Sequence, residues 1–140
     1  MRITTLILSL LFALLNFHAH ALVITCEDPI GNESAFILNG EVAIEKNTEA
    51  SRIVYSIAAN GKVTVLESSD GQAEEQRLID SLEWSRLGKG YLGIGKISLD
   101  NVSGSGSLYI DPHIELTSVI LNIDGEIVSG MSKFDCKETG

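Results

Sequence analysis

Three residues that could do chemistry together are Asp111, His113 and Glu115, which alternate along a short stretch of chain. In an extended backbone, alternate side chains point to the same face, so the three would lie side by side. A histidine between carboxylates could act in a small hydrolase or hold a divalent cation. The competing interpretation is a turn, in which Asp111 caps the backbone, Pro112 fixes its angle and His113 meets solvent.

The supply of histidine limits this chemistry. His113 is the only histidine after residue 20, so any Ser-His-Asp triad must use it, and no G-x-S-x-G nucleophile elbow precedes it. Zinc sites usually need several histidine or cysteine ligands, which one histidine cannot supply if the cysteines are paired. We therefore predict no catalytic residue and no metal ligand, and keep Asp111, His113 and Glu115 as a candidate polar cluster.

Residues 88–96 (GKGYLGIGK) match the spacing of two nucleotide-binding motifs, G-x-G-x-x-G and G-x-x-x-x-G-K. A phosphate-binding loop also needs a Ser or Thr after the lysine and a helix beyond it, whereas Ile97 follows here and the next residues favour a strand. Gly93 and Gly95 instead favour a strand that bends or is approached closely by a neighbour. We predict no cofactor.

Cys26 and Cys136 lie near the two ends of the chain. They lack the C-x-x-C spacing of redox sites, so a structural disulfide that joins the first strand to the last is the favoured interpretation. Cys26 also ends residues 23–26 (VITC), which loosely resemble a lipobox, the motif whose cysteine is lipidated. Thr25 stands where that motif has Gly, Ala or Ser, so a lipoprotein anchored at Cys26 is less favoured.

The first 21 residues have the pattern of a signal peptide. Arg2 precedes an apolar run at residues 6–15, which is too short to span a bilayer, and residues 19–21 offer an A-x-A cleavage site. Cleavage would leave one domain, residues 22–140, with no membrane span. This predicts a secreted or periplasmic protein, in a compartment where disulfides form.

The predicted mature chain is acidic, with a net charge of −10, because the leader removes Arg2 from a chain of charge −9. Phosphate recognition needs Lys and Arg to release counterions. Nucleic acid is therefore excluded as an expected partner.

Turn residues divide the chain into short β-type segments. Asn39-Gly40, Asn60-Gly61 and Asp124-Gly125 favour the two-residue turns of antiparallel hairpins. Residues 119–121 are apolar on both faces, which is typical of a central strand, and the glycine-serine run at 103–107 is expected to form a loop. The pattern predicts an all-β antiparallel fold, a barrel or two-sheet sandwich of about seven to nine strands.

Residues 69–87 favour helix and strand almost equally, with a slight preference for helix near residues 70–87. Ser69 and Gln72 have the spacing of a capping box, and Gly88 could end the helix. Trp84, the only tryptophan, is expected in the core rather than at a sugar-binding surface.

These observations predict a small exported, non-catalytic β domain that binds a protein partner or a small apolar ligand. The alternative is a small secreted hydrolase or metal-dependent enzyme that uses His113 with Asp111 or Glu115. The two are distinguished by whether the sheet encloses a hollow and whether these three side chains meet.

Overall fold

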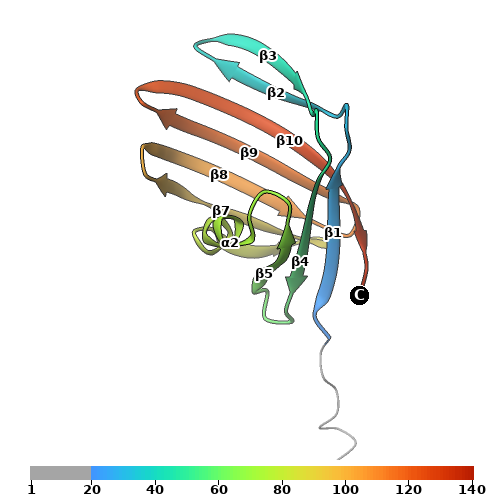
Figure 1. Cartoon of the computed structure of the whole chain (residues 1–140). Helices are drawn as coiled ribbons and strands as arrows, with labels where there is room; N and C mark the ends of the chain where they lie inside the picture. The colour runs from blue at the N-terminus through green and yellow to red at the C-terminus, as the bar shows by residue number, and fades with distance from the viewer. Residues whose placement is uncertain (1–19) are drawn as a thin grey trace, which may run out of the picture.

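A computed structural model describes residues 20–140, which form a curled antiparallel sheet and one short helix (Figure 1). The predicted all-β fold is confirmed. Residues 1–19 of the predicted signal peptide lie outside the described residues. The elements are β1 (Leu22–Asp28), β2 (Glu33–Leu38), β3 (Glu41–Lys46), β4 (Ser51–Ile57), β5 (Val63–Ser68), α2 (Gln72–Asp80), β6 (Glu83–Leu87), β7 (Gly90–Leu99), β8 (Val102–Ile110), β9 (Ile114–Ile123) and β10 (Glu126–Glu138).

Eight strands form a half-barrel in the order β5-β4-β1-β10-β9-β8-β7-β6, and the β2–β3 hairpin pairs with β10 beside them. The long strand β10 joins the two parts. Its C-terminal half pairs with β1, where Cys136 lies opposite Cys26. Its N-terminal half pairs with β2, where Met131 lies opposite Ala35. The sheet therefore splits into two branches on one side of β10.

Helix α2 connects β5 to β6, the two edge strands of the half-barrel. Its glutamines bind the backbone of β5: the Gln76 Oε1 atom accepts a hydrogen bond from the Val65 N–H at 2.7 Å, and the Gln72 Nε2 group donates to the Val65 carbonyl at 2.8 Å. On the other side, the Trp84 indole N–H donates to the Ile79 carbonyl at 3.0 Å. The helix thus satisfies an edge that would otherwise expose unpaired backbone groups.

The predicted helix at residues 70–87 is only half right. Helix α2 ends at Asp80, and the remaining residues form β6. The predicted capping box is wrong, because the N-cap is Gly71, at a φ of 113°, with no side-chain cap. Residues 83–87 pair with β7 instead, where Trp84 lies opposite Gly93 and packs against the core, as expected for this tryptophan.

Several glycines of β7 and β8 allow neighbouring residues to approach the backbone more closely than a side chain would permit. A Cβ atom at Gly93 would lie 2.8 Å from the Trp84 ring, and one at Gly95 would lie 2.6 Å from the Ser81 carbonyl oxygen, which confirms the close-approach interpretation of residues 88–96. The predicted loop at 103–107 is wrong, because these residues belong to β8. A Cβ atom at Gly104 would clash with the backbone oxygen of Ile120, so strand contact rather than loop flexibility requires this glycine. Residues 20–140 therefore contain ten strands, slightly more than the seven to nine predicted.

The other turn predictions are confirmed in part. Asn39-Gly40 and Asp124-Gly125 join hairpins, and all four residues have positive φ. The predicted disulfide between Cys26 and Cys136 is present and joins the first described strand to the last. Within residues 20–140, no helix is long and apolar enough to cross a membrane.

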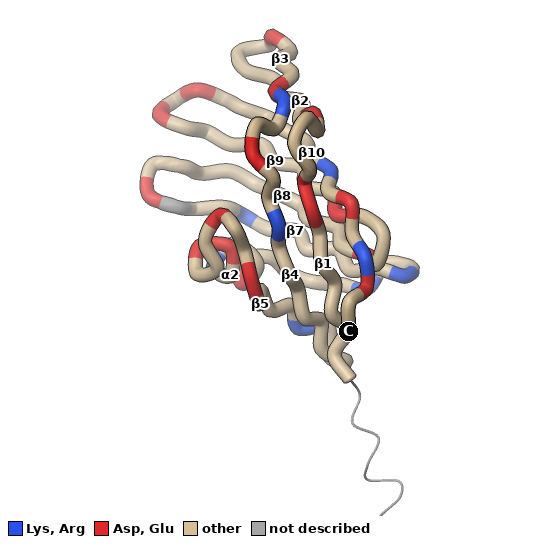
Figure 2. Tube along the Cα trace, turned by 45° about the vertical axis from the view of Figure 1, so that its right-hand side comes forward, with Lys and Arg blue, Asp and Glu red and all other residues tan. Residues whose placement is uncertain are grey.

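The core occupies only part of the sheet. It lies between α2 and the strands that surround the disulfide, and we call this part the proximal half. Its buried members are Ile24, Cys26, Ile53, Tyr55, Ile57, Val63, Val65, Ile79, Leu82, Leu108 and Ile110. The distal half comprises β2, β3 and the hairpin ends of β7–β10, residues 97–106 and 118–131. Figure 2 shows acidic residues on α2 and at the hairpin tips, with few basic residues between them.

Candidate functional site

A cavity of about 220 Å³ lies between α2 and the concave face of the sheet, where the two halves meet. Most of the exposed area of its wall is apolar, and its ionisable side chains lie on β4, on β9, on α2 and just before α2, while β5, β8 and β10 contribute serines. The wall includes Ile53, Leu78, Leu82, Ile97, Leu108, Val119 and Phe134, together with the polar residues Arg52, Tyr55, Asp70, Glu75, Glu115 and Thr117. It is the setting for the most unusual side chain of the described residues.

That side chain is Glu115, which is only 6% exposed. It lies on the interior face of β9, in register with Ile110 of β8 and Phe134 of β10. The Tyr55 hydroxyl donates a hydrogen bond to the Glu115 Oε2 atom at 3.1 Å. Burial raises the pKa of Glu115 to about 7, and the negative charges of Glu75 and Asp28 act in the same direction. Hydrogen bonds from Tyr55 and Thr117 oppose the rise.

Burial also raises the pKa values of two neighbours of Glu115, Tyr55 and Glu75. It raises the pKa of Tyr55 well above its ordinary value, and the nearby Glu115 charge adds to the shift, so Tyr55 remains a hydrogen-bond donor. On α2, burial raises the pKa of Glu75, with a further contribution from Asp70. A carboxyl group that resists ionisation beside an apolar cavity favours ligands that can compensate its charge.

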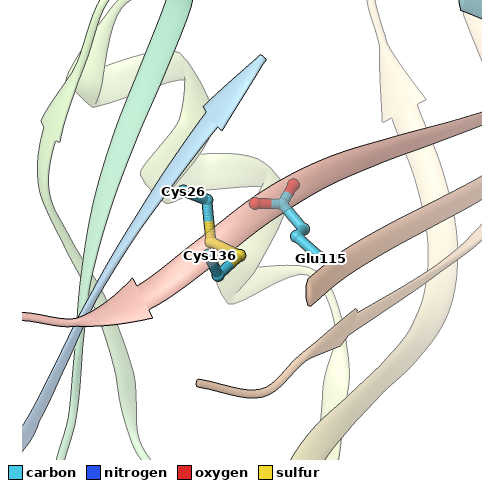
Figure 3. Close-up of side chains that lie close together, drawn as sticks. All are labelled: Cys26, Glu115 and Cys136. Carbon is cyan, nitrogen blue, oxygen red and sulfur yellow. A yellow bond between two sulfur atoms is a disulfide. The ribbon is translucent and has the colours of Figure 1, made fainter. Parts of the chain in front are cut away.

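The disulfide lies next to this carboxyl group (Figure 3). The sulfur atoms of Cys26 and Cys136 and a carboxylate oxygen of Glu115 lie within 4.8 Å of one another. Two thiolates and a carboxylate could hold a divalent cation, but both sulfurs are used by the disulfide bond. In the oxidised protein, this group of atoms is therefore a neighbour of the cavity rather than a metal site. The same bond occupies the Cys26 sulfur that a lipid anchor would need.

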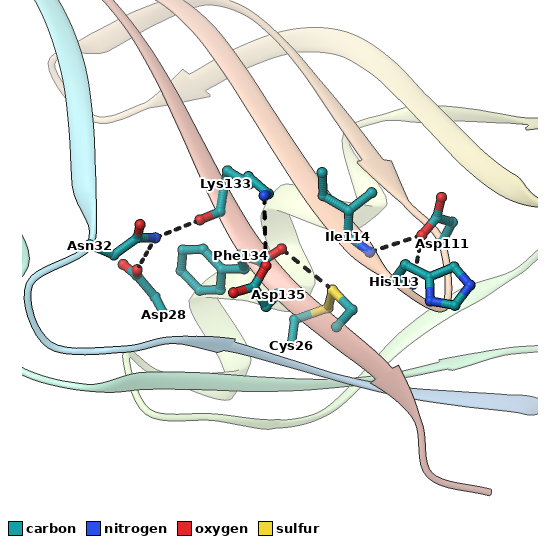
Figure 4. Close-up of polar contacts among 10 residues, drawn as sticks. Cys26, Asp28, Asn32, Asp111, His113, Ile114, Lys133, Phe134 and Asp135 are labelled. Carbon is teal, nitrogen blue, oxygen red and sulfur yellow. Dashed lines mark hydrogen bonds and ion pairs between the residues drawn. A yellow bond between two sulfur atoms is a disulfide. The ribbon is translucent and has the colours of Figure 1, made fainter.

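The predicted polar cluster does not assemble at one place: Asp111 and His113 lie in a turn (Figure 4), whereas Glu115 is buried. The Asp111 Oδ1 atom accepts hydrogen bonds from the backbone N–H groups of His113 and Ile114, at 2.7 and 2.8 Å. These bonds lower the pKa of Asp111, against the opposing effect of its partial burial. His113 is exposed, while Glu115 lies in the interior. The turn interpretation of residues 111–113 accounts for this arrangement.

Glu115 was a sequence candidate, but its partner Tyr55 was not. The two side chains are 60 positions apart, and neither belongs to a recognisable motif. The local pattern does not place Glu115 in the interior, because apolar residues occur at both strand parities: Val119 and Leu121 at its own, and Leu116 and Ile120 at the other.

A second notable surface lies on the convex side of the distal half. Register places Val42 opposite Ile37 and Ile37 opposite Ser129, which lies opposite Ile120. Val42 is 72% exposed and Ile120 is 56% exposed. We call Ile37, Val42, Ile44, Ile120 and Met131 the distal apolar face. Apolar side chains gathered in this way commonly mark an interaction surface.

The chain matches no protein-family model, and comparison with curated proteins and with solved structures found no similar protein. The function must therefore be inferred from the cavity, its buried carboxyl group and the distal apolar face.

Proposed function

We propose that this protein binds a small, mostly apolar ligand in the cavity beneath α2 and catalyses no reaction on it. The observation that carries the proposal is the cavity itself, whose apolar wall holds one buried hydrogen-bonded pair, Glu115 and Tyr55. Apolar walls with a few well-placed polar groups are typical of ligand sites. A cavity of about 150 Å³ accommodates benzene, so 220 Å³ suits one aromatic ring or a short alkyl chain.

We also propose that the protein is exported and acts outside the cytoplasm. The proposal is supported by the leader-like pattern of residues 1–21 and by the disulfide between Cys26 and Cys136. Mass spectrometry of the native protein tests it: the mature chain should begin at Leu22 and carry no free thiol.

Ligand binding is tested with 1-hexanol, a neutral probe of suitable size. Because a ligand that binds only the folded state stabilises it, 1-hexanol at about ten times its Kd should raise the melting temperature by about 3 °C or more. Leu78→Trp, which fills the cavity from α2, should abolish this rise.

The matched control is Ala73→Trp, which adds the same side chain at an exposed position of the same helix. This variant should respond to 1-hexanol as the unaltered protein does. An equal response in Leu78→Trp, or no response in any of the three proteins, would contradict binding in the cavity.

The enzyme alternative receives little support from the geometry. His113 is exposed, Asp111 binds backbone N–H groups, and Glu115 faces the cavity. The three groups therefore do not form a nucleophile-activating arrangement.

A second candidate function is suggested by β3, whose outer edge has no strand partner within residues 20–140. One face of this strand carries Glu41 and Glu45, and the other carries Val42 and Ile44, all exposed. An extended segment of a partner protein could add to this edge. Charge complementarity favours a segment with basic residues beside the glutamates and apolar residues beside the distal apolar face.

A pair of synthetic strand peptides tests this second function. One alternates Lys with Val, and the other alternates Glu with Val. The lysine peptide should shift the backbone amide NMR signals of β3, whereas the glutamate peptide should not. Equal shifts from both peptides, or none from either, would exclude this mode of recognition.

A further inference from the structure

The charges around the cavity are unbalanced. Glu115, Glu75 and Asp70 line it, and among residues 20–140 Arg52 is the single basic residue of the wall. The Arg52 Nη1 atom lies 3.3 Å from the Glu67 Oε1 atom, outside the cavity wall, and this ion pair already offsets its charge. Within residues 20–140, a ligand that enters the cavity therefore meets three carboxyl groups and one guanidinium group that is already paired.

This imbalance discriminates among possible polar head groups. A carboxylate or phosphate on the ligand would be repelled by the carboxyl groups, and burying two like charges in one site is strongly unfavourable. A hydroxyl group on the ligand could form a neutral hydrogen bond with the protonated carboxyl group or a charge-assisted one with the carboxylate, but it would not neutralise the charge. An ammonium group would form a charge-assisted hydrogen bond and neutralise a buried charge, so it gains most from this wall.

The aromatic residues favour the same head group. Phe134 lies directly opposite Glu115 in the β9–β10 ladder, and both line the cavity. A cation next to the Glu115 carboxylate would therefore lie near the Phe134 ring, where a cation–π contact adds to the attraction. The apolar side chains of Leu78 and Leu108 bound the remaining space.

We propose that the ligand of this cavity is a small primary amine in its ammonium form, with an apolar body of one ring or a short chain, bound through its ammonium group to the Glu115 carboxylate. The proposal rests on the proposed function, because it names the class of ligand for the same cavity.

The proposal predicts how binding depends on pH. The titratable groups that face Glu115 are Tyr55 on β4, Glu75 on α2 and Asp28 at the end of β1, while the neighbouring disulfide does not titrate. None of these groups is a cation that could replace the ligand. Because Glu115 has a pKa of about 7 in the free protein, an ammonium ligand should bind about tenfold more tightly at about pH 8 than at about pH 6.

Calorimetry with three probes of equal chain length tests the head group: hexylamine, 1-hexanol and hexanoate, each at about pH 6 and about pH 8. At the higher pH, hexylamine should bind at least about tenfold more tightly than 1-hexanol, and hexanoate should bind most weakly. The affinity of 1-hexanol should change much less between the two pH values.

Glu115→Gln keeps an acceptor for the Tyr55 hydroxyl and removes the charge. This variant should lose both the preference for hexylamine and its pH dependence, while it retains 1-hexanol. Glu83→Gln, at an exposed position of β6, is the matched control and should behave as the unaltered protein does.

A measurement on the unaltered protein makes the test independent of how the variant folds. Carboxyl ¹³C NMR should show that hexylamine lowers the pKa of Glu115 and that 1-hexanol does not. If 1-hexanol binds as tightly as hexylamine at the higher pH, or if the pKa of Glu115 does not fall, the amine proposal is wrong while cavity binding stands. If no probe binds, both proposals are wrong.

Discussion

Strand β9 buries a charged side chain in the proximal half and exposes an apolar side chain in the distal half. In the proximal half, Glu115 is buried at 6% exposure, whereas in the distal half Ile120 of the same strand is 56% exposed. A carboxyl group inside and an isoleucine outside both work against folding stability, since charges resist burial and apolar groups favour it. Such inversions are expected where a molecule binds something. One sheet thus supports a small buried site on one face and an open apolar surface on the other.

The two side chains point to opposite faces of β9, and only the concave face, which carries Glu115, is covered by α2. In the proximal half, α2 and the β1–β4–β5 strands pack over the concave face, so the interior residues of every strand become core. In the distal half, β7–β10 and the β2–β3 hairpin extend beyond α2 (Figure 1). Residues 119–121, which are apolar on both faces, lie in a central strand as predicted. The convex face of this strand is open in both halves, because Leu116 and Ile120 are both exposed.

The largest expected effect is loss of the disulfide, which fastens the proximal half. Replacing both Cys26 and Cys136 with Ala releases a link across 110 residues and should lower the free energy of unfolding by about 4–5 kcal/mol in the chain-entropy account. Urea denaturation of the variant and the oxidised protein measures it. A loss below about 1 kcal/mol would show that the disulfide does not hold the proximal half.

A matched pair of isoleucines compares the halves directly. Ile110 is fully buried in the proximal core, and Ile120 lies on the distal apolar face. Ile110→Ala should cost about 2–5 kcal/mol of folding free energy because it leaves a cavity, whereas Ile120→Ala should cost less than about 1 kcal/mol. Equal costs, again from urea denaturation, would mean that the distal face is covered in solution.

A smaller effect concerns pH. The folded-state pKa of Glu115, about 7, exceeds its ordinary value of 4.5, so the folded protein retains a proton that the unfolded chain releases. The stability from this group is present below about pH 4.5 and is lost as the pH rises through about 7. Between about pH 5 and pH 8, the unaltered protein should lose about 2–3 kcal/mol more stability than Glu115→Gln. Parallel stability curves for the two proteins would contradict the assigned burial of Glu115.

The sequence predicts those parts of the fold that depend on a few neighbouring residues, or for which only one possibility exists. Positive φ at Asp124-Gly125 is a property of those residues, so the hairpin could be located. With two cysteines available, only one disulfide is possible. In contrast, the sequence predicts a loop at residues 103–107, inside β8, because only the approach of the Ile120 backbone of β9 explains why Gly104 is a glycine.

The cavity could not be predicted from the sequence, because it is formed by residues that lie far apart along the chain. Its walls come from α2 and from six strands, β4, β5, β7, β8, β9 and β10, and its polar pair joins Tyr55 to Glu115 across the fold. The spacing of Asp111, His113 and Glu115 indicated a shared face, but the turn at 111–113 breaks the extended backbone that this interpretation requires.

Ligand binding in the cavity is tested most directly by locating bound 1-hexanol through intermolecular nuclear Overhauser effects with the methyl groups of the protein. Contacts with Leu78, Leu108 and Val119, which line the cavity, are the result we expect. Contacts confined to Val42, Ile44 and Met131 would instead place apolar binding on the distal face and contradict the function proposed for the cavity.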